Sequence, residues 1–167
     1  MSFGVVPVQS GRVVLSEAVY REVAPSRASG GQAVAVHELR SVDLALAPPI
    51  GAVRDELASA LAGRVVLAWV ADVEIAFLRR IFGGSDRTWR RRTVDVWRLS
   101  MAVDRLEGRA VKKRRTLAGT CVHFGVPVED EHHALDDALM TAEIFLVLAS
   151  RLEARGLPTL QALAEAR

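Results

Sequence analysis

Residues 131 to 142 combine two histidines and three acidic residues at the head of a predicted helix, reading Glu-His-His-Ala-Leu-Asp-Asp-Ala-Leu-Met-Thr-Ala. A histidine in the loop just before a helix can accept a proton from an attacking water, and an aspartate in the first turns can hold a divalent ion beside a phosphate. His132 and Asp137 have this spacing, with the small Ala134 between them. A structural interpretation stays open, in which the histidines cap the helix and Asp136 and Asp137 complement its positive end.

The elements that must position these side chains follow from local patterns. Three segments rich in β-branched residues predict a small antiparallel meander. Apolar residues at helical spacing predict several helices, and a short continuous apolar run predicts a strand buried on both faces. The expected strands span residues 3–8, 12–15, 18–23, 64–70 and 93–97, and the expected helices lie near residues 50–61, 75–82, 99–106, 117–124 and 134–154.

Strands that come first and then alternate with helices predict an α/β fold, a mixed sheet flanked by helices. With 167 residues, half of them hydrophobic, we expect a single domain over residues 1–154, followed by a short C-terminal helix or tail over 155–167. Cys121 is the lone cysteine, which excludes an internal disulfide. No leader or membrane-spanning run is recognisable, so we expect a cytoplasmic location.

Positive charge is concentrated in one part of the chain. Residues 79–115 contain 13 Lys or Arg against 4 Asp or Glu, a balance of +9, whereas the whole chain carries only +2. Such a segment attracts a phosphate backbone, and we expect it to hold a nucleic-acid strand, with Arg114 and Arg115 among the substrate-binding residues. The alternative is an ordinary arginine-rich protein surface.

The segment from His132 to Ala138, with Thr141 and Ala142 one turn later, resembles the third motif of the DEDDh exonucleases, a family that includes the proofreading epsilon subunit of bacterial DNA polymerase III. In that register His132 corresponds to the general base and Asp137 to a metal-binding carboxylate. Residues 63–78 resemble the second motif and place Glu74 where the family carries a metal-binding aspartate.

Further segments match the same family in the same order. Residues 36–39 followed by 47–49 are similar to the part that abuts the 3′-terminal nucleotide, which makes His37 and Leu39 substrate-binding candidates. Residues 93–95 resemble the next strand, in which Asp95 is structural and not a ligand. The resemblance implies a ribonuclease H-like sheet and a 3′→5′ exonuclease that uses two Mg²⁺ or Mn²⁺ ions. It implies a single-stranded nucleic acid or 3′ terminus as substrate, with DNA favoured over RNA, and a polymerase or a second copy of the chain as further partner.

Three departures from the family pattern bear on activity. Trp69 and Val70 stand where the family usually has His-Asn, and Glu74 is one methylene longer than aspartate, with Asp72 as a substitute ligand of poorer spacing. The family's first strand, which is central in the sheet and carries Asp-x-Glu, has no counterpart in this sequence. Its absence would expose two strand edges, so the coding region begins further upstream, or the chain is partnered or degenerate.

Without that motif we expect the chain as written to hydrolyse nucleic acid poorly or not at all. One alternative is a non-catalytic nucleic-acid-binding or scaffolding module with a degenerate exonuclease fold. A weaker alternative is a His/Asp metal phosphohydrolase, although none of the four histidines is followed by Asp. The nuclease interpretation requires that Glu74, His132 and Asp137 meet in one region of the fold.

Overall fold

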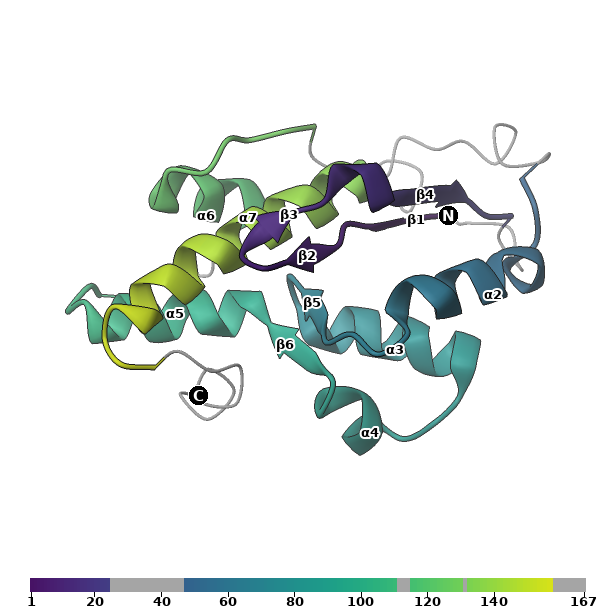
Figure 1. Cartoon of the computed structure of the whole chain (residues 1–167), viewed down its shortest axis with the longest axis horizontal. Coiled ribbons are helices and arrows are strands. Elements are labelled where there is room, and N and C mark those ends of the chain that lie inside the picture. The colour runs from purple at the N-terminus through teal and green to yellow at the C-terminus, as the bar shows by residue number, and fades with distance from the viewer. Residues whose placement is uncertain (25–46, 111–114, 131, 158–167) are drawn as a thin grey trace.

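A computed structural model describes residues 1–24, 47–110, 115–130 and 132–157, and the structural statements below concern these residues (Figure 1). The predictions for His37, Leu39 and Arg114, and the C-terminal helix expected beyond residue 157, lie outside this part of the chain. None of the helices within it has the length and apolar character needed to cross a bilayer.

The N-terminal segment forms the predicted meander. It comprises β1 (Ser2–Val5), β2 (Val8–Gln9), β3 (Arg12–Val13) and β4 (Val19–Glu22). β1 pairs antiparallel with β4, and β2 with β3 across a two-residue turn in which both Ser10 and Gly11 have positive φ. The strand expected to reach Leu15 ends at Val13, because residues Leu15–Glu17 form a 3-10 turn, η1.

The middle of the chain alternates helices with two short strands. Its elements are α2 (Ile50–Leu61), β5 (Val66–Ala68), α3 (Ala71–Phe82), α4 (Asp86–Arg90), β6 (Thr93–Asp95) and α5 (Val96–Leu106). β5 and β6 pair in parallel, and each leads within three residues into a helix. α4 is absent from the sequence-based expectation, although Ser85, whose side chain accepts a hydrogen bond from the backbone of Thr88, is a typical N-cap.

Two helices complete the described chain. α6 (Leu117–Phe124) begins after the predicted cap Thr116 and ends at Gly125 in the left-handed conformation. α7 (Ala134–Glu153) buries Met140, Ile144, Leu148 and Leu152 completely, at the four-residue spacing of one helix face. These side chains pack with residues of α5 and α6 in the main core.

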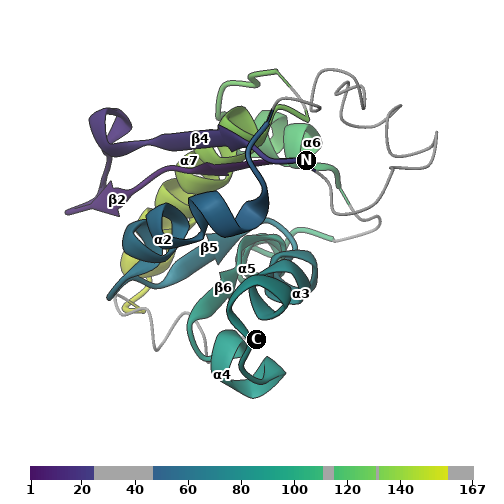
Figure 2. The same cartoon turned by 90° about the vertical axis from the view of Figure 1, so that its right-hand side faces the viewer.

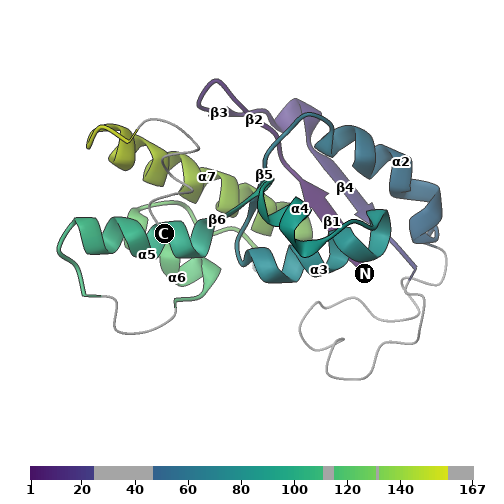
Figure 3. The ribbon, with the colours of Figure 1, turned by 90° about the horizontal axis from the view of Figure 1, so that it is seen from below.

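α7 connects the two ends of the molecule. It begins against β1 and β4 and runs to α5 (Figure 1). The β1–β4 ladder and the β5–β6 ladder both contact α7, and Figure 2 shows the first above the second, with α3 beside β6 and α4 below. From below, α5 and α6 lie at the end of the molecule opposite to α2 (Figure 3).

The sheet is divided into three two-stranded ladders among the described residues. Consequently β1 and β5 each have one hydrogen-bonded neighbour there. The prediction that the 64–70 strand is buried on both faces is wrong, because Val65 is 44% exposed and Val66 and Leu67 are only half-buried. A strand with one partner has an uncovered edge, which explains this exposure.

Candidate active site

The start of α7 brings the predicted general base close to a predicted metal ligand. The backbone N–H of His132 donates to Oδ1 of Asp137 over 3.4 Å, and the N–H of Asp137 donates to the carbonyl oxygen of His133 over 2.9 Å. His132 is exposed and has a φ of 71°, a conformation that non-glycine residues adopt at a cost. In the turn before α7, the strained backbone of His132 is therefore held next to the carboxylate of Asp137.

Glu74 lies in the first turn of α3, and its carboxyl group is poorly compensated. Its Oε2 atom is buried and has no hydrogen-bond partner in the described part of the chain. The pKa of Glu74 is raised to about 7, mainly by burial and also by the charges of Asp95 and Asp137, while a backbone hydrogen bond opposes the rise. Glu74 thus feels the charge of Asp137, a residue on a different helix.

Asp137 therefore connects the predicted residues: its charge acts on Glu74, and its carboxylate accepts the N–H of His132. The grouping of all three in one active site stays a prediction. The individual roles of the three residues stay predictions.

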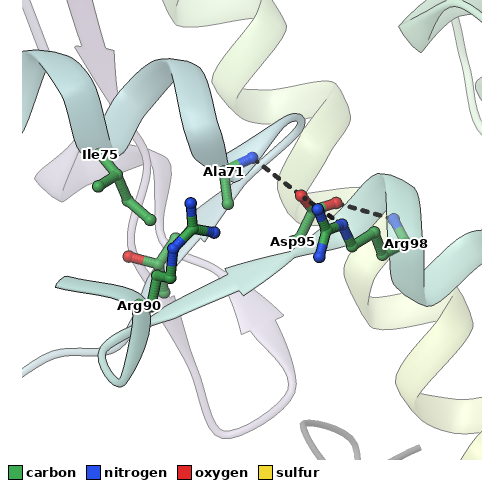
Figure 4. A pocket seen from close by; sticks show the side chains of 6 residues that line it. Ala71, Ile75, Arg90, Asp95 and Arg98 are labelled. Carbon is green, nitrogen blue, oxygen red and sulfur yellow. Dashed lines mark hydrogen bonds and ion pairs between the residues drawn. The ribbon is translucent and has the colours of Figure 1, made fainter. Parts of the chain in front are cut away.

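Asp95 ties this region to the end of β6. Its Oδ2 accepts the N–H of Ala71 at the start of α3 (3.1 Å), and its Oδ1 accepts the N–H of Arg98 in the first turn of α5 (2.8 Å; Figure 4). One carboxylate thus caps two helices, which suits the structural role expected for Asp95. An aspartate between a strand and a helix is the sequence signal for such a cap.

Beside Asp95 the surface is basic and shallowly hollowed. Asp72, the substitute ligand, forms ion pairs with Arg90 (2.7 Å) and Arg98 (3.8 Å), and Arg98 also lies 3.7 Å from Asp95. Both arginines are more than 40% exposed. The pocket between these side chains, shown in Figure 4, is lined by Ala71, Ile75, Arg90, Thr93, Asp95 and Arg98.

The donor atoms in this region suit a hard divalent cation in kind but are few in number. Carboxylate oxygens are the ligands that Mg²⁺ and Mn²⁺ prefer, and the buried, unpartnered Oε2 of Glu74 is an atom that a cation would satisfy. Among the described residues, however, no three His, Cys, Asp or Glu side chains gather closely enough to hold a metal together. Glu74 and Asp137 thus offer carboxylate oxygens of the right kind without a complete ligand set among the described residues.

Known proteins share both sequence and fold with this chain. No family model matches it. It is 32% identical over 155 residues to a DNA polymerase III subunit epsilon-like protein of Rhodobacter capsulatus, and the match covers 92% of this chain. The chain spans about a fifth of the length of that relative, 21%. Among solved structures it resembles Exonuclease X in complex with 5′ overhanging duplex DNA, with a TM-score of 0.61 and 19% identity over 96% of this chain and 86% of that one.

The predicted likeness to the DEDDh-type exonuclease family is confirmed. The α/β, ribonuclease H-like fold class is confirmed with it, because the structural match extends over nearly the whole chain. The absence of a first motif stays a prediction.

The predicted substrate contact Arg115 lies in a network of ion pairs around Asp104. Asp104 is fully buried in α5, and its carboxylate contacts Arg109 (2.9 Å), Arg115 (2.6 Å) and His123 (2.8 Å). Although burial opposes ionisation, hydrogen bonds from these three side chains lower the pKa of Asp104 to about 2. The sequence interpretation did not include this network, whose members lie between residues 104 and 123 but form no recognisable motif.

The Asp104 network is distant from the start of α7. Glu107 extends it, because it pairs with Arg109, with Arg151 (3.0 Å) and with Arg155 (3.1 Å). Arg151 lies fourteen residues after Asp137 on α7, which corresponds to about 20 Å of helix rise. A substrate-binding role for Arg115 stays a prediction, but its guanidinium is held at the opposite end of α7.

Proposed function

We propose that this chain is the body of a metal-dependent 3′→5′ exonuclease that removes nucleotides from the 3′ end of a nucleic acid. The observation that supports the proposal is the buried Glu74 oxygen that lacks a partner among the described residues, together with Asp137, whose charge acts on Glu74 and whose carboxylate accepts the N–H of His132. A carboxyl group with a strongly raised pKa beside other titratable groups is typical of functional sites. The DEDDh-type likeness supports the same assignment.

The residues would divide the chemistry as follows. Glu74 and Asp137 would hold Mg²⁺ or Mn²⁺, which when bound supplies charge that stabilises the phosphate in the transition state. The exposed imidazole of His132 would accept a proton from the attacking water. The bond from phosphorus to the 3′ oxygen of the preceding nucleotide breaks, and the terminal nucleotide leaves.

The preferred substrate is a DNA strand with an accessible 3′ end. Exonuclease X, the structural neighbour, is described in complex with 5′ overhanging duplex DNA. In this chain the exposed Arg90 and Arg98 lie beside Asp95 and offer positive charge next to the carboxylates. We propose that they contact phosphates upstream of the scissile one.

Turnover should be slow for the chain as it stands. Two carboxylates are too few to fix two divalent cations a short distance apart, and the described residues provide no third ligand nearby. The same observation favours a second candidate, a nucleic-acid-binding module that does not cleave. The two candidates differ in metal-dependent product formation.

The decisive experiment uses single-stranded DNA with a 5′ label, which reveals shortening from the 3′ end. With Mg²⁺ or Mn²⁺ the chain, or a version extended upstream in frame, should yield a ladder of shorter products. Asp137→Ala should lower the rate at least about a hundredfold, because it removes one of the two proposed ligands. Asp55→Asn, at an exposed position on α2, should retain the rate.

The outcomes separate the candidates. Cleavage that survives Asp137→Ala would remove the site assignment. Salt-sensitive DNA binding with no metal-dependent shortening, even in the extended version, would favour the non-catalytic module.

A further inference from the structure

A glycine in β1 allows the start of α7 to approach the strand very closely. A Cβ atom placed on Gly4 would lie 2.4 Å from the carbonyl oxygen of Ala134 and 2.6 Å from Cα of Leu135. Both are backbone atoms, so no side-chain rotation could relieve the overlap. Gly4 is not among the residues with positive φ, so the close contact, and not its conformation, requires glycine here.

The residue opposite Gly4 supports the same turn through its side chain. Gly4 pairs with Tyr20 in the β1–β4 ladder, and directly opposed residues project from the same face of a sheet. The Tyr20 ring lies 4.7 Å from the His133 ring, centroid to centroid, with the planes tilted by 32°. On this face of the ladder, Gly4 of β1 leaves room for the backbone of α7, and Tyr20 of β4 places its ring against His133.

The turn supported in this way carries the residues of the candidate site. His133 is the N-cap of α7 but makes no side-chain capping bond; its Nδ1 lies 2.9 Å from Oδ2 of Asp136 instead. His132 precedes it with a positive φ and donates its N–H to Asp137. Without a capping side chain, packing against the sheet must hold this strained backbone in place.

We infer that Gly4 and Tyr20 are positioning residues, which set the location of the His132–His133 turn and, through it, of Asp137 relative to Glu74. The inference rests on the proposed function for its catalytic meaning, while the geometry it describes is independent of that function. A Cβ at position 4 would displace the first turn of α7, and loss of the Tyr20 ring would leave His133 unsupported. A ligand shifted by about an ångström loses much of its effect.

The test compares Gly4→Ala with Gly51→Ala, in which a Cβ meets nothing within 4 Å, and Tyr20→Leu with Tyr20→Phe, which keeps the ring and removes only the hydroxyl. The first readout is the set of imidazole NMR chemical shifts at fixed pH without metal. Gly4→Ala and Tyr20→Leu should move the His132 and His133 signals, and His123, which belongs to the separate Asp104 cluster, should stay in place. Gly51→Ala and Tyr20→Phe should resemble the wild type.

The second readout is the affinity for Mn²⁺, measured by titration. Gly4→Ala and Tyr20→Leu should raise the apparent Kd about tenfold or more, as loss of a support behind a ligand does, while both controls stay within about twofold. Unchanged His132 and His133 signals in folded Gly4→Ala would overturn the inference. If that variant does not fold, the contrast between Tyr20→Leu and Tyr20→Phe decides. If the wild type does not bind Mn²⁺, the proposed function is wrong. The His132 and His133 chemical shifts then test the positioning role of Gly4 and Tyr20 on their own.

Discussion

Two carboxyl groups buried in the same fold have opposite surroundings. Asp104 is inaccessible to solvent but touches Arg109, Arg115 and His123, and its pKa is lowered to about 2. Glu74 is also largely buried, yet one of its oxygens has no described partner and its pKa is raised to about 7. Burial acts in the same direction on both residues, and the neighbouring charges decide the outcome.

The difference distinguishes a carboxylate that stabilises the fold from one that is suited to bind a ligand. The charge of Asp104 is neutralised by cations of the protein itself, so it has no need of an external ion. Burial makes the ionised form of Glu74 costly, and the charges of Asp95 and Asp137 add to this cost. A network of ion pairs joins parts of the chain, whereas an uncompensated group marks a candidate site.

The largest effect should come from Asp104→Asn. This change leaves two arginines and a histidine without their shared counter-charge, and breaking a buried pair by removing one partner typically costs about 3 to 5 kcal/mol. Chemical denaturation should show a loss of this order in the free energy of unfolding. Asp86→Asn, which affects an exposed pair with Arg79, should cost less than about 1 kcal/mol. Equal losses in the two variants would contradict the distinction between them.

Glu74 should give a pH dependence of stability in buffer with a metal chelator. Its pKa in the folded protein, about 7, lies above the unfolded value of 4.5, so its contribution is complete below pH 4.5 and is lost as the pH rises through about 7. The loss amounts to at most about 3 kcal/mol. Glu74→Gln should remove this dependence without lowering stability at neutral pH. If the free energy of unfolding of the wild type does not change between pH 4.5 and about 7, the proposed difference between Glu74 and Asp104 is wrong.

Asp104 should show the opposite dependence in acid. Its folded pKa of about 2 lies below the unfolded value of 3.8, so its contribution is present above pH 3.8 and is lost as the pH falls through about 2. A difference of this size corresponds to about 2 kcal/mol. Denaturation curves between pH 5 and pH 2, compared with those of Asp104→Asn, should isolate this contribution; parallel curves for the two proteins would refute it.

The smallest effect concerns the arginines beside Asp95. Arg98→Gln should weaken binding of single-stranded DNA modestly and reduce the salt dependence of the binding constant by about one phosphate contact. Arg21 is another exposed arginine, which pairs with Glu56 of α2. Its replacement, Arg21→Gln, should leave the salt dependence of DNA binding unchanged. If the binding constant depends on salt equally in both variants, the bound DNA does not pass over α5.

Much of the fold could be predicted from local sequence signals. Thr116 and Gly125 bound α6 as their types suggest, and the apolar residues of α7 recur at helical spacing. The positions of Glu74 and Asp137 in the first turns of two helices could also be anticipated from the motifs that contain them.

Features that depend on tertiary contacts could not be predicted. Arg109, Arg115 and His123 gather around Asp104 only when α5 and α6 pack, and the need for glycine at position 4 arises only when α7 packs on β1. The composition of the basic segment could not indicate that Arg115 contacts Asp104, because this contact depends on how α5 packs; its substrate-binding role stays a prediction.

Asp137 belongs to the same helix that supplies the most deeply buried core side chains, Met140, Ile144, Leu148 and Leu152. A helix anchored in this way melts only when the whole core does, apart from fraying at its ends. Helical circular dichroism should therefore disappear in a single cooperative transition. The first turn, which carries Asp137, can fray earlier, so hydrogen exchange should be faster at Asp137 than at Ile144 or Leu148.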